Sequence, residues 1–75
     1  MASTIFIQSD RPIQLIVTVL LAAQFQVNAI ANPIYHGYKH VIELSTWGGT
    51  IDPEPILKFL KKQGHPNAIQ IYPNT

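Results

Sequence analysis

Four residues with metal-binding or acid–base side chains lie close together in the middle of the sequence: His36, Lys39, His40 and Glu43. Histidines four positions apart can bind one metal ion when they share a face of a helix. Gly37 and the β-branched residues that follow predict a turn and a strand instead, on which the two histidines would lie about 13 Å apart. We therefore expect no metal site here and no cofactor.

Other catalytic or nucleic-acid-binding patterns are also absent from the sequence. The serines Ser3, Ser9 and Ser45 and the three histidines show no spacing that predicts a Ser-His-carboxylate triad. Five basic and four acidic residues give a net charge of +1, which provides no electrostatic basis for binding nucleic acid. These features predict a protein that is not an enzyme and has no nucleic-acid partner.

The composition predicts one small domain, covering residues 1–75, whose surface is unusually poor in charge. Charged residues make up 12% of the chain, about half the ~25% typical of soluble domains. The chain contains no cysteine, so disulfides cannot stabilise it. A chain of this size buries a limited core, and uncharged surface is typical of the centre of protein interfaces.

An apolar segment without charged residues, residues 12–38, contains the main structural ambiguity. Its apolar residues fit one helical stripe made of Ile13, Ile16, Leu20, Ala23, Val27 and Ile30. They also fit a strand, because every odd position from 13 to 29 is apolar. Length favours a helix over about 13–31, ending before Pro33. A strand pair remains the rival, supported by the β-branched run at 16–19.

The same segment has two further interpretations. Residues 13–31 have the length and the lack of charge of a single membrane span, although four Gln and Asn side chains would then lie in or near the hydrocarbon. The Ala29-Ile30-Ala31 stretch also resembles a signal-peptide cleavage site. We expect a buried helix in a cytoplasmic protein, with the membrane as the alternative.

The remaining segments predict an alternation of strands and helices. Residues 4–8, 40–46 and 68–72 have the composition of strands. Residues 52–64 predict a helix, because Asp52 can cap it, Pro53 and Pro55 suit its first turn, and Gly64 can end it. The prediction is therefore an α/β (or α+β) domain of β-α-β-α-β order with two helices and a three-stranded sheet. Residues 40–72 would form a β-α-β unit with parallel neighbouring strands.

From this architecture we expect a small non-enzymatic subunit or interaction module. Burying the predicted stripe would leave several apolar side chains of the first helix on its outer side, and exposed apolar patches mark contact sites. The module would complete its core against a partner protein or as a homo-oligomer; the alternative is a single-pass accessory subunit of a membrane complex. The predicted interface residues are Leu15, Val17, Leu21, Phe25, Tyr35, Tyr38 and Trp47.

Overall fold

Two helices and four strands make up the part of the chain that the structure describes. The computed structural model describes residues 2–73; residues 1, 74 and 75 of the predicted 1–75 domain lie outside them. The order along the chain is β1 (Ala2–Gln8), α1 (Leu15–Phe25), β2 (Asn28–Tyr35), β3 (Tyr38–Trp47), α2 (Pro53–Lys62) and β4 (Ile69–Ile71).

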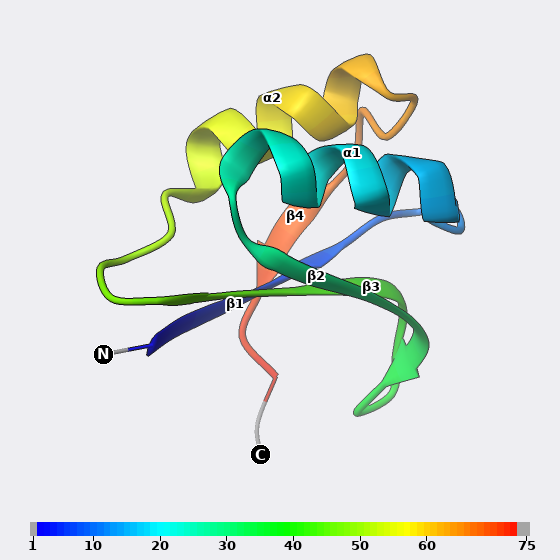
Figure 1. Cartoon of the computed structure of the whole chain (residues 1–75). Helices are drawn as coiled ribbons and strands as arrows, with labels where there is room; N and C mark the ends of the chain where they lie inside the picture. Colours follow the sequence, from blue (N-terminus) through cyan, green and yellow to red (C-terminus); the bar gives the residue numbers. More distant parts are fainter. Residues whose placement is uncertain (1, 74–75) are drawn as a thin grey trace.

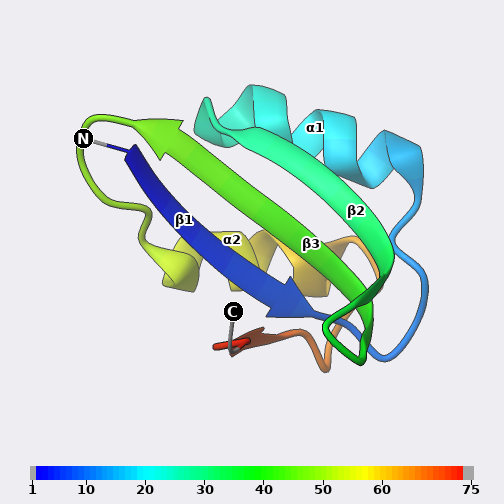
Figure 2. The same cartoon turned by 90° about the horizontal axis from the view of Figure 1, so that it is seen from below.

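The strands form one antiparallel sheet in the order β2-β3-β1-β4. Both helices cover one face of this sheet, and the other face is open (Figures 1 and 2). The chain contains two β-α-β units, β1-α1-β2 and β3-α2-β4. In each unit, one strand of the other unit lies between the two strands, which is the split β-α-β arrangement of ferredoxin-like topology. The domain is therefore α+β, and the predicted β-α-β-α-β order with three strands is wrong by one strand.

The additional strand is β2, which takes up the last four residues of the helix predicted over 13–31 and continues to Tyr35. Helix α1 ends at Phe25, and Gln26 adopts left-handed angles (φ 54°) while its N–H bonds to the carbonyl of Ala22. The chain then pairs residues 28–35 with β3 through a tight turn at His36 and Gly37. The apolar pattern permitted both structures, and pairing with β3 selected the strand.

Because this segment forms a helix and a strand, it does not form the single long helix of the predicted membrane span. Helix α1 has 11 residues, whereas a span needs about 20. Among the described residues, no helix combines the length and the apolar character needed to cross a bilayer.

The predicted β-α-β unit over 40–72 is confirmed in its elements but not in its pairing. Strands β3 and β4 belong to the same sheet, as expected. They are not neighbours, because β1 lies between them and pairs antiparallel with both. Strand β1 fits this place because Ile5 and Ile7 lie opposite Leu44 and Ile42 on the face that the helices cover.

Helix α2 confirms the prediction for residues 52–64. The carboxylate of Asp52 accepts a hydrogen bond from the N–H of Glu54 (3.1 Å), and Pro53 begins the helix. Gly64 follows the helix with a φ of 96°, an angle that glycine adopts without strain. Ile56 and Leu60 are buried as expected.

The main core lies between the helices and the sheet. It consists of seven buried residues: Ile7, Val17, Leu21, Ile42, Leu44, Ile56 and Leu60. Helix α1 contributes Val17 and Leu21, so the predicted buried stripe through Ile16 and Leu20 is wrong. Helix α1 is apolar on every side, so its sequence could not indicate which side would face the sheet.

A pair of substitutions in α1 tests this orientation. We expect Leu21→Ala to lower the free energy of unfolding by about 2–5 kcal/mol, because it leaves a cavity in the core. Leu15→Ala, on the exposed side of the same helix, should change it by no more than about 0.5 kcal/mol in dilute solution, where no partner covers this side. Urea denaturation followed by circular dichroism measures both. Equal effects would contradict the orientation.

Candidate interaction surface

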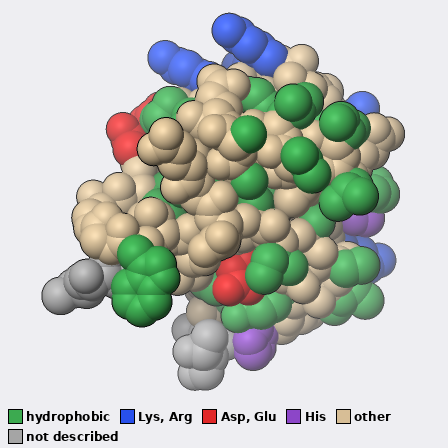
Figure 3. Space-filling view, viewed as in Figure 1, with side chains coloured by type: hydrophobic (Ala, Val, Ile, Leu, Met, Phe, Trp, Pro, Cys, Tyr) green, Lys and Arg blue, Asp and Glu red, His purple; other side chains and the backbone are tan. Residues whose placement is uncertain are grey.

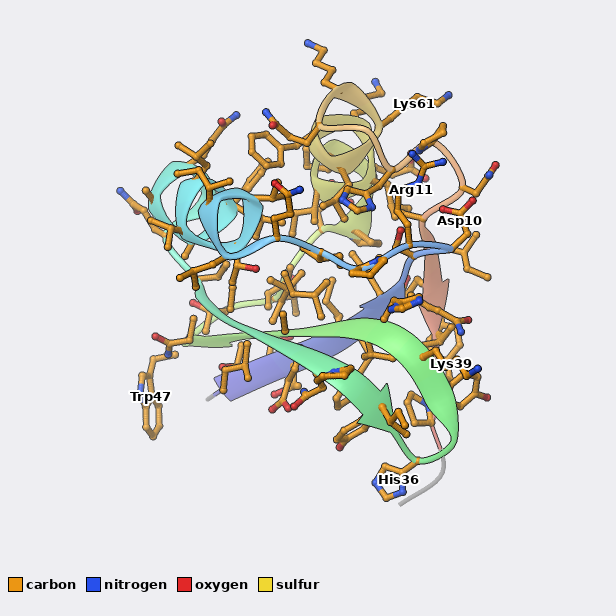
Figure 4. The ribbon with its side chains drawn as sticks, turned by 90° about the vertical axis from the view of Figure 1, so that its right-hand side faces the viewer. Asp10, Arg11, His36, Lys39, Trp47 and Lys61 are labelled. Carbon is orange, nitrogen blue, oxygen red and sulfur yellow. The ribbon has the colours of Figure 1, made fainter. Side chains whose placement is uncertain are left out.

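Three of the predicted interface residues are exposed. Leu15 at the start of α1 and Trp47 at the end of β3 are 78% and 84% exposed, and Tyr38 follows the β2–β3 turn at 36%. Figure 4 shows Trp47 projecting from the end of the sheet opposite His36, which marks that turn. These three residues are available for contact, but Trp47 lies far from the turn that precedes Tyr38.

Three other predicted interface residues are part of the interior. Val17 and Leu21 are buried in the main core, so their expected exposure is wrong. Phe25 is half-buried and packs edge-to-face on Phe59 of α2, with 5.8 Å between ring centroids. The physical reason is the orientation of α1 about its own axis, which points these side chains toward the sheet and α2.

The seventh predicted interface residue, Tyr35, packs within the chain. Its ring stacks on Phe6 with a centroid distance of 4.9 Å and an interplanar angle of 22°. The Tyr35 side chain therefore reaches past β3 to contact β1. Tyr35 is half-buried by this contact, which leaves only part of its surface for a partner.

The side of α1 that faces away from the core carries the most concentrated exposed apolar surface of the described residues. Leu15, Ile16, Val19 and Leu20 are between 44% and 78% exposed. Their spacing of three and four residues places them on one side of the helix, and hydrophobic side chains gather over α1 in Figure 3. The sequence pattern predicts Ile16 and Leu20 in the core. The lack of a polar side on the helix is the one sequence signal compatible with their facing outward.

Strand β2 lies next to this helix and forms one edge of the sheet. It contains no Asp, Glu, Lys or Arg, and Ile30 and Ile34 are 56% and 67% exposed. Natural sheet edges usually carry charged residues, bulges or prolines that prevent pairing with other chains. Among these devices β2 has only Pro33 within its sequence, so its edge is lightly protected.

We call the outward side of α1 and the edge of β2 together the α1/β2 surface. All its residues come from the segment between Arg11 and Lys39, which contains no charged residue. On the neighbouring strand β3, Glu43 and Lys39 lie opposite Ile30 and Ile34. Other charged side chains lie farther along the chain, as in the Arg11–Asp10 ion pair (3.6 Å) and at Lys61 on α2 (Figure 4). Removing this surface from water would therefore desolvate no ionised side chain of its own.

The hollows on the described surface are small. Five of them have volumes between about 210 and 310 Å³, at or below the lower end of the 300–1,000 Å³ range of ligand pockets. One, of about 270 Å³, lies beside the α1/β2 surface, where Pro12 and Ile13 face Pro33 and Val41. Its mainly apolar walls suit an inserted apolar side chain better than a polar substrate.

The structure also brings together a serine and a histidine that no sequence pattern connects. Ser9, after β1, and His65, after α2, lie 56 positions apart, yet their Oγ and Nδ1 atoms are 2.6 Å apart. The N–H of Arg11 donates to the same Oγ at 3.3 Å. The neighbouring Asp10 accepts a hydrogen bond from the amide of Asn67 at 2.9 Å. Together these bonds connect the β1–α1 loop with the α2–β4 loop.

The environment of this pair indicates a structural role. A serine beside a histidine can act as an activated nucleophile, but Ser9 and His65 are only 3% and 4% exposed. Neither residue lines any of the five hollows. Burial lowers the pKa of His65, the nearby Arg11 lowers it further, and Asp10 opposes the shift. The lowered pKa favours the neutral ring, whose Nδ1 can accept a hydrogen bond from the serine hydroxyl.

The histidines that first suggested metal binding lie at the β2–β3 hairpin. His36 occupies the turn with a φ of 49°, and His40 lies in β3 with a φ of 58°. Within residues 2–73, no three His, Asp or Glu side chains are grouped so that they could hold a metal ion. The His36 ring instead packs edge-on against Tyr35, with 4.5 Å between centroids.

Comparison with known proteins adds no family assignment. Protein-family models, curated protein sequences and solved structures gave no significant match to this chain.

The lowered pKa of His65 predicts a loss of stability in acid. Because the pKa is lower in the folded state than its unfolded value of 6.5, the unfolded chain takes up a proton first as the pH falls through 6.5. We expect a lower free energy of unfolding at pH 5.5 than at pH 7.5, measured by urea denaturation. His65→Asn should reduce this difference, and His36→Asn, at an exposed position, should leave it unchanged. An unaltered difference in His65→Asn would refute the assignment.

Proposed function

We propose that this protein is a small non-enzymatic interaction module that binds a protein partner through the α1/β2 surface. The observation that supports the proposal is the exposure of Leu15, Ile16, Val19 and Leu20 on a helix that contains no charged residue. A helix that is apolar on all sides is normally buried on all sides. The sheet and α2 cover only one side of α1, so a partner would cover the other.

The energetics favour such a partner. Fully burying one large aliphatic side chain contributes on the order of 1.5–3 kcal/mol. Folded domains are stable by only about 5–15 kcal/mol, so covering several half-exposed side chains would contribute an amount comparable with the stability of the domain. Since the surface contains no charged side chain, little electrostatic desolvation opposes this gain.

The chemistry of the site agrees better with binding than with catalysis. Ser9 and His65 are buried and line none of the five hollows. The α1/β2 surface offers amides and the phenol of Tyr35 but no carboxylate, imidazole, thiol or serine hydroxyl. We propose the cytoplasm as the location of the module. Fractionation of cells that express the chain tests this location.

A lysine substitution on the outer side of α1 tests the proposal. Leu20 is 44% exposed, so Leu20→Lys should preserve the fold, as judged by circular dichroism. We expect it to abolish association with any specific partner, including a second copy, because a buried lysine without a counter-charge is unfavourable. Quantitative affinity purification from the source cells, together with sedimentation of the pure chain, measures this loss.

The matched control is Ile69→Lys on β4, far from the α1/β2 surface. Ile69 is exposed, and its substitution should leave association unchanged. A partner that Leu20→Lys retains, or a wild-type chain that is monomeric and has no partner, would refute the proposed function.

A further inference from the structure

The edge of β2 offers backbone hydrogen-bonding groups that no other strand satisfies within the sheet. Strand β2 pairs with β3 on one side and has no strand on the other. It is eight residues long, whereas the opposite edge strand, β4, has three. Long uncharged edges are templates for pairing with a further strand, so β2 is the favoured edge for strand addition.

Pro33 indicates which residues of β2 point their backbone groups outward. Within sheets, proline is confined to positions whose missing N–H would face away from the ladder. Backbone groups alternate sides along an antiparallel strand, so Ala29 and Ala31 share the outward orientation of Pro33. Their N–H and C=O groups can pair with another strand, while Asn28, Ile30 and Asn32 bond toward β3.

We propose that the strand added to this edge is β2 of a second copy of the same chain, in an antiparallel pair centred on Ile30. This proposal specifies the partner of the α1/β2 surface and so rests on the proposed function. Ala29 of each copy would exchange both backbone hydrogen bonds with Ala31 of the other. Ile30 of one chain would face Ile30 of the other across a two-fold axis. The two four-stranded sheets would then become one continuous sheet.

This register is compatible with the side chains on both faces. By register with Leu44 and Ile42, Ala29 and Ala31 point toward the helix layer. Their small side chains leave room above the joined strands, where the outward side of each α1 would meet the other. On the open face Ile30 is 56% exposed, and pairing would remove it from water. Pro33, which lacks an N–H, takes no part in the four backbone hydrogen bonds that join Ala29 and Ala31 of the two copies.

Charge and size favour a second copy over an unlike partner. The α1/β2 surface has no charged residue that would require a complementary charge, and a net charge of +1 gives little repulsion between copies. A standard interface buries about 800 Å² per partner, roughly one sixth of the 4894 Å² surface of this chain. A two-fold pair also closes on itself, and the three-residue β4 edge gives little basis for further growth.

The lack of cysteine makes the register directly testable by cross-linking. A non-hydrogen-bonded antiparallel pair has Cα atoms about 4.5 Å apart, which lies within the range that a disulfide spans. Ile30→Cys should therefore form a disulfide-linked dimer under mild oxidation at micromolar concentration. Ile69→Cys is the matched control, because Ile69 and Ile30 are both 56% exposed, and it should remain largely uncrosslinked.

Sedimentation of the full chain provides the equilibrium measurement. We expect wild-type and Ile69→Lys chains to be dimers, and Ile30→Lys to weaken the dimer at least about 100-fold, since like charges would face each other at the axis. Circular dichroism should confirm that Ile30→Lys remains folded. Equal cross-linking at positions 30 and 69, or a dimer unaffected by Ile30→Lys, would overturn the proposal.

The outcomes separate this inference from the proposed function. A wild-type chain that stays monomeric at several hundred micromolar would refute self-association. If that monomer still bound a defined partner, and Leu20→Lys abolished the binding, the α1/β2 surface would remain a docking surface for an unlike protein. If neither self-association nor a partner depended on Leu20, both proposals would fail.

Discussion

A helix that is apolar on all sides can bury only one side against a sheet, and most features of this domain depend on that constraint. Val17 and Leu21 of α1 enter the core with Ile42 and Leu44 of β3. Leu15, Ile16, Val19 and Leu20, on the opposite side of the helix, then face outward. The same packing that stabilises the fold thus leaves this apolar side of α1 uncovered.

The end of α1 has equal importance, because it sets where β2 begins. The left-handed conformation of Gln26 stops the helix after 11 residues and turns the chain into an edge strand. Helix and strand come from one uncharged segment, and the apolar side of α1 and the lightly protected edge of β2 lie side by side. An interface that joins helix packing to strand pairing needs both features in one place.

The opposite side of the molecule is held by polar contacts as well as by packing. Helix α2 is amphipathic, with Ile56 and Leu60 in the core and lysines on its exposed side. Beyond its end, the Ser9–His65 hydrogen bond fixes the loops at this end of the sheet. Buried polar groups are stabilising only when they are paired, and this pair gives the α2–β4 loop a defined position without disulfides.

The sequence alone determined the elements whose signals are local. Helix α2 followed from the Asp52 cap, the prolines and Gly64, and β1, β3 and β4 followed from short β-branched runs. The scarcity of charge, and with it the expectation of an interaction surface, also came from the sequence. Tertiary structure decided the rest: that residues 28–35 form a strand, that β1 separates β3 from β4, and that α1 buries Val17 and Leu21. These outcomes depend on which surfaces meet in three dimensions, and an apolar segment that fits both a helix and a strand, with no polar side, contains no local information that would choose among them.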